Sequence, residues 1–118
     1  MKFINPSLVI ITISFLIYSC GKPTPEEVTT ELVEALANGE CDKAQKLTID
    51  YAFFIVQMVI DAGCVDYEMK VKSVECTETS EMAICTCIEE RDGREMTYTY
   101  DLVKTEEGWK VSNWPLDF

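Results

Sequence analysis

The chain from residue 25 to about residue 63 has the hydrophobic spacing of helices. Thr24, Pro25, Glu26 and Glu27 form a capping box with proline at the first helical position. Asn38 and Gly39 end this helix, and two further helical segments follow at about 42–47 and 49–62, the last ending at Gly63. Because the segment 49–62 carries little charge, we expect it to be the most buried helix. The apolar face of the first helix comprises Val28, Leu32, Ala35 and Leu36.

The remainder of the chain has the alternation of β-strands. Four strands are predicted, at 67–78, 82–90, 95–104 and 109–114, and Asp92-Gly93 is a strong two-residue hairpin signal. Pairing across that turn places two cysteines opposite two tyrosines. The face that we expect to form the core contains Ala83, Cys85, Cys87, Met96, Tyr98, Tyr100 and Leu102.

The first predicted strand changes its alternation midway. Tyr67, Met69 and Val71 lie in one phase, whereas Val74 and Cys76 lie in the other. A β-bulge near residues 72–73 would reconcile the two phases and bend the sheet. Helices followed by an antiparallel meander predict an α+β fold, in which N-terminal helices pack on one face of a curved four-stranded sheet and form a cone-like domain over residues 25–118.

The N-terminus has the pattern of a lipoprotein signal peptide. Lys2 precedes an apolar run over residues 8–17, which is shorter than the ~20 residues of a membrane span. Ile17-Tyr18-Ser19-Cys20-Gly21 resembles a lipobox, whose thiol accepts the lipid. We therefore predict a signal peptide at 1–19, palmitate-type acylation at Cys20 and a tether at 20–24. A plain secretory signal and a short membrane anchor are the alternatives.

Gly21, directly after the cysteine, resembles the pattern of lipoproteins sent to the outer membrane. The predicted location is therefore the cell envelope, with the domain held close to a bacterial membrane, most simply the outer one. Only residues 21–24 separate the lipid from the first helix, so the domain should lie near the bilayer and not on a long stalk.

The chain of 118 residues is strongly acidic, with a formal net charge of −11. This charge argues against nucleic acid as a partner, because nucleic-acid-binding proteins need a basic surface. It also argues against a domain that lies flat on anionic lipid. Its simplest role is to keep a small protein soluble.

Five cysteines remain once Cys20 is assigned to the lipid. In an oxidising envelope they are most simply disulfides, and their odd number leaves at least one thiol over. Cys41 and Cys64 flank the second and third helices, so antiparallel packing would join them. Cys76 faces Cys85 if the hairpin turns at 80–81, and a shifted register would offer Cys87 instead. We predict Cys41–Cys64 and Cys76–Cys85, with Cys87 as a free, buried thiol.

Three features together carry a family resemblance. They are the helix at 25–39, the Ala83-x-Cys85-x-Cys87 strand that ends at Asp92-Gly93, and the closing segment from Leu102 to Val111. Over residues 25–114 the chain resembles small bacterial lipoproteins with a nuclear-transport-factor-two-like (NTF2-like) cone, similar to SnoaL-like proteins and in particular to a lumazine-binding-like group of unknown function. Members usually carry aliphatic residues where this chain has Cys85 and Cys87. The resemblance implies the fold, but this fold hosts enzymes, ligand binders and scaffolds alike.

Few residues are suited to catalysis. The resemblance implies that enzymes of this fold work inside the cone, with Asp or His as base and Tyr or Asp as oxyanion donor. This chain has no histidine. Tyr98 and Tyr100 are candidates to line a cavity, and Asp50 or Asp61 could act as a base, although buried tyrosines and helix-end aspartates usually have structural roles.

A metal site would have to use Cys76, Cys85 and Cys87, which lack a fourth ligand at standard spacing. A redox site would require a Cys-x-x-Cys motif, which is not present. We therefore predict no cofactor and no metal.

The leading hypothesis is a non-enzymatic envelope lipoprotein that binds a small apolar ligand or a protein partner. The alternatives are a structural or immunity-type envelope protein without a ligand, and an isomerase- or dehydratase-like enzyme.

Overall fold

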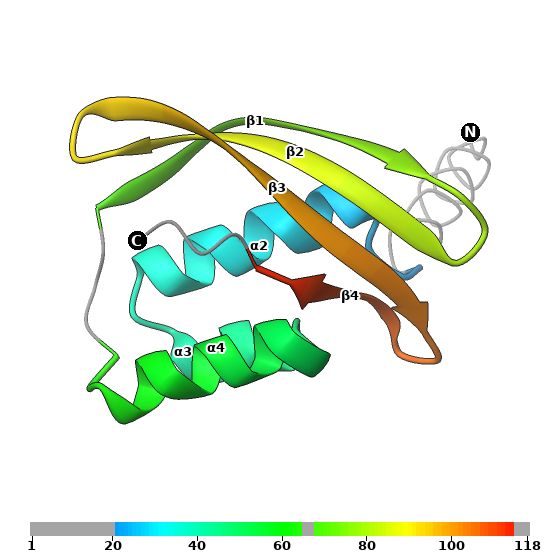
Figure 1. Cartoon of the computed structure of the whole chain (residues 1–118), viewed down its shortest axis with the longest axis horizontal. Coiled ribbons are helices and arrows are strands. Elements are labelled where there is room, and N and C mark those ends of the chain that lie inside the picture. The colour runs from blue at the N-terminus through cyan, green and yellow to red at the C-terminus, as the bar shows by residue number, and fades with distance from the viewer. Residues whose placement is uncertain (1–20, 65–67, 115–118) are drawn as a thin grey trace, which may run out of the picture.

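The computed structural model describes residues 21–64 and 68–114. The predicted signal peptide, Cys20 and the expected first-strand residue Tyr67 lie outside these ranges. Three helices come first, and four strands follow them (Figure 1). The helices are α2 (Pro25–Ala37), α3 (Cys41–Lys46) and α4 (Asp50–Asp61), and the strands are β1 (Met69–Glu78), β2 (Met82–Arg91), β3 (Arg94–Thr105) and β4 (Gly108–Asn113).

The strands form one antiparallel sheet in the order β1-β2-β3-β4. Its long strands twist and curve over α2, while α3 and α4 lie beyond α2 and beside the short strand β4 (Figure 1). The predicted α+β fold is confirmed, as is the bulge, since the β1–β2 register shifts between Val71 and Ser73. Asp92 and Gly93 both have positive φ, as a tight β-hairpin turn between twisted strands requires.

Helix α2 begins with the predicted capping box. The Thr24 hydroxyl accepts a hydrogen bond from the Glu27 backbone N–H, and the Glu27 carboxylate accepts one from the Thr24 N–H. Its apolar face packs against β1, β2 and β4, and Leu32 is fully buried.

The sheet register places Cys85 opposite Tyr100 and Cys87 opposite Tyr98, as expected. All four side chains are buried beneath the sheet, together with Ala83 and Leu102. Met96 was expected in the same core but is 37% exposed; it lies near the hairpin turn, two residues after Arg94, where β3 begins.

The expectation that the third helix is the most buried is wrong. Only Ala52, Ile55 and Val56 of α4 are buried, whereas α2 buries seven residues. The reason is position: α4 packs on α3 and β4 at the border of the molecule, so one side of it meets no other element among the described residues. Four large apolar side chains of this helix are exposed, namely Tyr51, Phe53, Phe54 and Met58.

Candidate functional site

A charged cluster lies under the sheet at the end of β2. Side chains on a strand alternate between its two faces, so Glu89 and Arg91 share the inner face with Cys85 and Cys87. The Glu89 side chain is fully buried, and that of Arg91 is 15% exposed. A buried carboxylate needs hydrogen-bond donors around it, and here they come from Arg91 on the same strand and Tyr100 on β3.

Both oxygens of the Glu89 carboxylate are bound. Tyr100, on β3, donates its hydroxyl to Oε2 at 2.5 Å. Arg91 donates from Nε and Nη2 to Oε1 at 3.0 and 2.7 Å. The Arg91 guanidinium also lies over the Tyr98 ring, 4.1 Å from its centroid, in a cation–π contact. We call Glu89, Arg91 and Tyr100 the inner cluster.

The inner cluster shifts the acidity of its members. Burial by itself lowers the pKa of Arg91, but the hydrogen bonds and charge of Glu89 outweigh it and raise that pKa above its usual value. Burial, followed by the charge of Glu89, raises the pKa of Tyr100. The same two causes raise the pKa of the Cys87 thiol to about 12. Tyr100 and Cys87 therefore remain protonated at neutral pH.

Tyr98 and Tyr100, the candidate cavity residues, are both buried and have different partners. The Tyr98 hydroxyl lies 3.2 Å from the Met96 sulfur. The Tyr100 ring packs edge-on against Trp114, with centroids 5.7 Å apart, while its hydroxyl faces Glu89. Only Tyr100 of the pair therefore contacts a group that could take part in proton transfer.

An apolar cleft opens beside the inner cluster, between α4 and the ends of the strands. It holds about 30 Å³, which is the room of roughly one water molecule. Arg91 belongs to both the cleft wall and the inner cluster, so the cleft adjoins the inner cluster at this side chain. The other lining residues are apolar: Leu36, Ile55, Val56, Val59, Met69 and Trp114.

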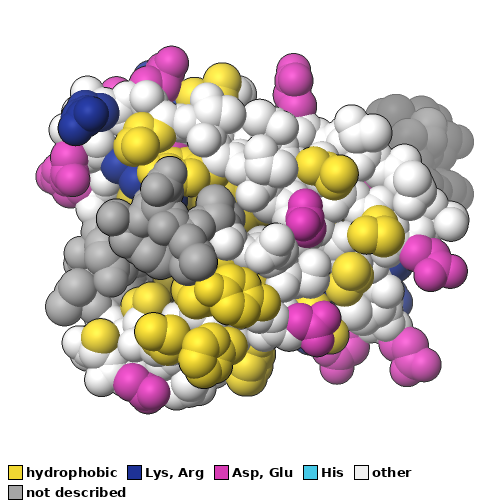
Figure 2. Space-filling model, viewed as in Figure 1, with side chains coloured by type: hydrophobic (Ala, Val, Ile, Leu, Met, Phe, Trp, Pro, Cys, Tyr) yellow, Lys and Arg dark blue, Asp and Glu magenta, His cyan; other side chains and the backbone are white. Residues whose placement is uncertain are grey.

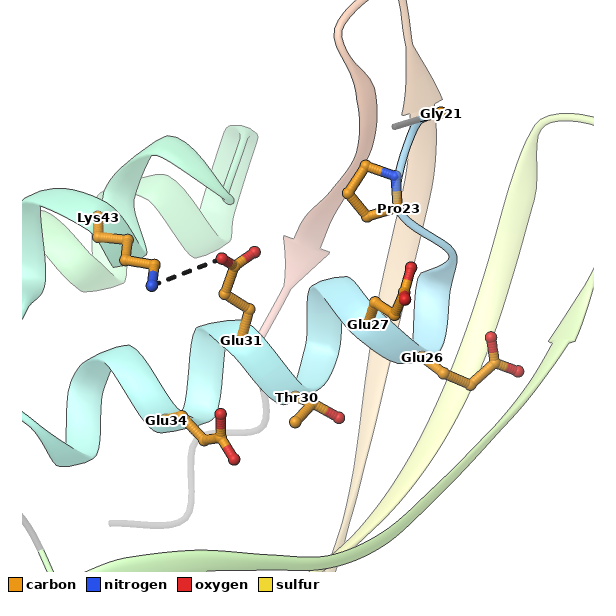
Figure 3. Close-up of a pocket in the computed structure, with 8 residues that line it drawn as sticks. All are labelled: Gly21, Pro23, Glu26, Glu27, Thr30, Glu31, Glu34 and Lys43. Carbon is orange, nitrogen blue, oxygen red and sulfur yellow. Dashed lines mark ion pairs between the residues drawn. The ribbon is translucent and has the colours of Figure 1, made fainter. Parts of the chain in front are cut away.

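A wider hollow of about 550 Å³ lies on the outer side of α2 (Figure 3). Its wall carries Glu26, Glu27, Glu31 and Glu34, and Lys43 on α3 points toward Glu31 at 3.5 Å. These side chains are solvated, and their charge is the expected one for the outer face of an amphipathic helix. Across residues 21–64 and 68–114, no group of three or more Cys, Asp or Glu side chains is arranged to hold a metal ion.

The structure joins the cysteines in two pairs. Cys41 is bonded to Cys64 across the ends of α3 and α4, and Cys76 is bonded to Cys85 across β1 and β2. Cys87 is a free, buried thiol. The three sheet cysteines therefore do not present three thiolates to a metal.

Asp50 and Asp61, considered as possible bases, are exposed at the two ends of α4. Sequence reasoning missed Glu89 and Arg91. The alternation of side chains along β2 could have found them. Residues 83, 85 and 87 are buried on the inner face, and the same spacing places Glu89 and Arg91 on that face.

No family model matches the sequence, and no curated protein matches it. Solved structures do match in shape. A candidate NTF2-like transpeptidase from Campylobacter jejuni superposes with a TM-score of 0.55 at 13% identity, covering 77% of this chain and 99% of its own. A candidate NTF2-like dehydratase from Streptomyces avermitilis gives 0.54 at 17% identity, covering 76% and 93%. An NTF2-like protein with a cystatin-like fold from Novosphingobium aromaticivorans gives 0.52 at 14% identity, covering 78% and 79%.

The chain therefore has the NTF2-like, cone-shaped α+β fold. Similarity at this level of identity defines the fold and leaves the activity open. Within the part of the chain that the structure describes, no helix has both the length and the apolar character needed to cross a membrane.

Proposed function

We propose that this chain is a cell-envelope lipoprotein, anchored at Cys20, whose domain binds a small apolar ligand or a protein partner at the cleft and does not catalyse a reaction. The observation that carries the proposal is the state of the interior acid: the Glu89 carboxylate is fully buried and accepts three hydrogen bonds, two from Arg91 and one from Tyr100. A general base needs an accessible lone pair within reach of a substrate proton, and the burial of Glu89 keeps substrate away from it. The inner cluster therefore supports a structural role, and the apolar cleft remains as the binding feature.

The chemistry of the cleft favours an apolar occupant. Six of its seven lining residues are apolar, and the seventh, Arg91, is ion-paired to Glu89 at 2.7 Å. Because that pair has no net charge, the cleft offers little attraction to a charged ligand. A volume of about 30 Å³ means that an occupant must either be small or move α4 outward.

Binding can be tested on the full-length protein in zwitterionic micelles, with xenon as a small apolar probe and methyl NMR as the readout. We expect the Ile55 and Val59 methyl signals to shift saturably, because both residues line the cleft. The Ile84 methyl signals should stay fixed, since Ile84 is exposed on the sheet away from the cleft. Val59→Phe fills the cleft and should abolish the shifts. Absence of any saturable shift in the wild type would eliminate the small-ligand proposal.

The anchor is tested separately. Mass spectrometry of membrane-extracted protein should find acyl chains on an N-terminal Cys20, and Cys20→Ala should release the domain from membranes. An unmodified N-terminus at another residue, in soluble protein, would contradict the lipoprotein proposal whatever the cleft binds.

An isomerase- or dehydratase-like activity is the second candidate, because Tyr100 donates to a buried carboxylate beside a cleft. It requires the Arg91–Glu89 pair to open. A structural or immunity-type role without a ligand is the third candidate, and the small volume of the cleft favours it. Saturable binding at Ile55 and Val59 would exclude this third candidate.

A further inference from the structure

The exposed face of α4 carries the largest gathering of unprotected rings in the described structure. Tyr51, Phe54 and Met58 follow the i, i+3, i+7 spacing that places residues on one side of a helix. They are 42%, 57% and 52% exposed, and the rings of Tyr51 and Phe54 lie 6.5 Å apart. Figure 2 shows hydrophobic side chains gathered over this helix, with acidic side chains at its margins. We call these three residues the α4 stripe.

The chemistry of the α4 stripe fits a lipid interface. Aromatic rings with one polar edge, such as Tyr51, are favoured at the level of the lipid headgroups. Helix α4 has no Lys or Arg, and its two acidic residues, Asp50 and Asp61, stand at its ends. Nothing on the stripe itself therefore repels or attracts a charged headgroup, and its contact with a bilayer would come from buried apolar surface.

The start of the domain lies beside the β3–β4 turn, from which β4 leads to the beginning of α4. Gly21 directly follows the predicted lipidation site, and Lys22 is already attached to the fold: its Nζ donates to the Glu106 carbonyl at 2.5 Å. Its side chain also lies beside Gly108, where β4 begins. The tether is thus held at the β3–β4 turn, and at most one or two residues separate this turn from a lipid on Cys20.

Strand β4 connects that turn to α4. The N–H of Ile49, the residue that precedes α4, donates to the Val111 carbonyl at 2.9 Å. Gly108 and Val111 are three residues apart, or about 10 Å along a strand. The lipid and the first turn of α4 are therefore close enough for one bilayer surface to meet both.

We propose that the α4 stripe rests on the surface of the membrane that holds the lipid anchor, with Tyr51, Phe54 and Met58 in the headgroup region. The inference rests on the proposed lipidation of Cys20. This second contact would add buried apolar surface to the attachment that the lipid provides. It would also fix the orientation of the domain, with the outer face of the sheet turned away from the bilayer.

The test uses the full-length, lipidated protein in phosphatidylcholine vesicles that contain brominated acyl chains, which quench nearby tryptophan. Phe54→Trp places the reporter on the stripe, and Ile84→Trp places a matched reporter on the sheet, where Ile84 is 53% exposed. The native Trp109 and Trp114 are buried and give the same background in both variants. We expect Phe54→Trp to be quenched at least about twofold more strongly than Ile84→Trp, as for an aromatic ring at the interface.

Equal quenching of the two reporters, or stronger quenching at position 84, would overturn the inference. Mass spectrometry and vesicle flotation of the same samples distinguish the two failures. Lipidated protein that floats without quenching at position 54 refutes the α4 contact alone, and cross-linking through position 54 to a protein would then identify the stripe as a protein interface. Protein that is unmodified at Cys20 and does not float refutes both proposals.

Discussion

The inner cluster and the exposed face of α4 invert the usual distribution of side chains. Beneath the sheet a glutamate and a tyrosine hydroxyl are buried and an arginine is largely covered, whereas on α4 three aromatic rings and a methionine are exposed. The difference shows that the position of a residue in the fold decides whether its side chain is buried. The residue type decides how much free energy that burial costs. Glu89 tolerates burial because three donors reach it, while Phe54 is exposed because no element covers that side of α4.

The largest loss of stability is expected from a substitution that breaks the inner cluster. Glu89→Gln removes the charge that pairs with Arg91 at 2.7 Å beneath the sheet, which should lower the free energy of unfolding by about 3–5 kcal/mol. Urea denaturation would measure it. Glu90→Gln, one residue away on the opposite face of β2, is the control and should change stability by less than about 0.5 kcal/mol. A double Glu89→Leu, Arg91→Leu variant should recover much of the loss; equal denaturation midpoints for Glu89→Gln and wild type would refute this account.

A smaller loss of stability should follow from removing one of the hydrogen-bond donors to Glu89. Tyr100→Phe keeps the ring against Trp114 but deletes the hydroxyl that binds Glu89, at an expected cost of about 1.5–3 kcal/mol for a hydrogen bond to a charged group. Tyr98→Phe is the matched control. Among the described residues its hydroxyl meets only the Met96 sulfur, so Tyr98→Phe should cost clearly less stability. If both variants lost the same stability in urea, the charged partner would be irrelevant.

The raised pKa of Cys87 predicts a dependence of stability on pH. The thiol has a pKa of about 12 in the folded protein, against 9.0 ordinarily, so the unfolded chain loses this proton first. Stability should be unaffected by Cys87 below pH 9 and should fall above it, by at most about 1.4 kcal/mol per pH unit. Urea titrations at pH 8 to 10 would show the decline, and Cys87→Ala should reduce it. An identical slope in the variant would show that the thiol titrates normally.

The smallest effect on stability is expected from substitutions on the exposed face of α4. Phe54→Ser should change the free energy of unfolding by less than about 0.5 kcal/mol, because the ring is already 57% exposed. Leu32→Ala on α2 is the contrast. That side chain is fully buried, and its truncation should cost about 2–5 kcal/mol. A large loss in Phe54→Ser would mean that another part of the chain covers α4.

Periodicity predicted the elements, the β2–β3 register and the bulge, because each depends on local pattern and turn chemistry. The capping box at Thr24 and the turn at Asp92-Gly93 fixed the boundaries for the same reason. The burial of α4 could not be predicted in this way. The low charge of this helix indicated that it lies in the core. The number of charges does not show, however, whether another helix or strand covers each side of the helix.

The inner cluster was hidden for a related reason. A glutamate followed two residues later by an arginine looks like a solvated strand end, and the pattern does not reveal that Tyr100 and the helices enclose it. Predicting burial there requires knowing how far the helical layer extends along β2. That distance is a property of the assembled fold.

The placement of the disulfides has a mechanical consequence. The Cys41–Cys64 bond closes a loop within the helical layer, and the Cys76–Cys85 bond closes a hairpin. Among the described residues, neither disulfide therefore links the helices covalently to the sheet. A force applied between the anchored end and the far end of the domain could shear the two layers apart without meeting a covalent bond. The loops that the two disulfides close span 23 and 9 residues. At ~3.5 Å per residue, they shorten the fully extended chain by about 110 Å. An oxidised molecule pulled from a membrane should therefore stop short of a reduced one by that length.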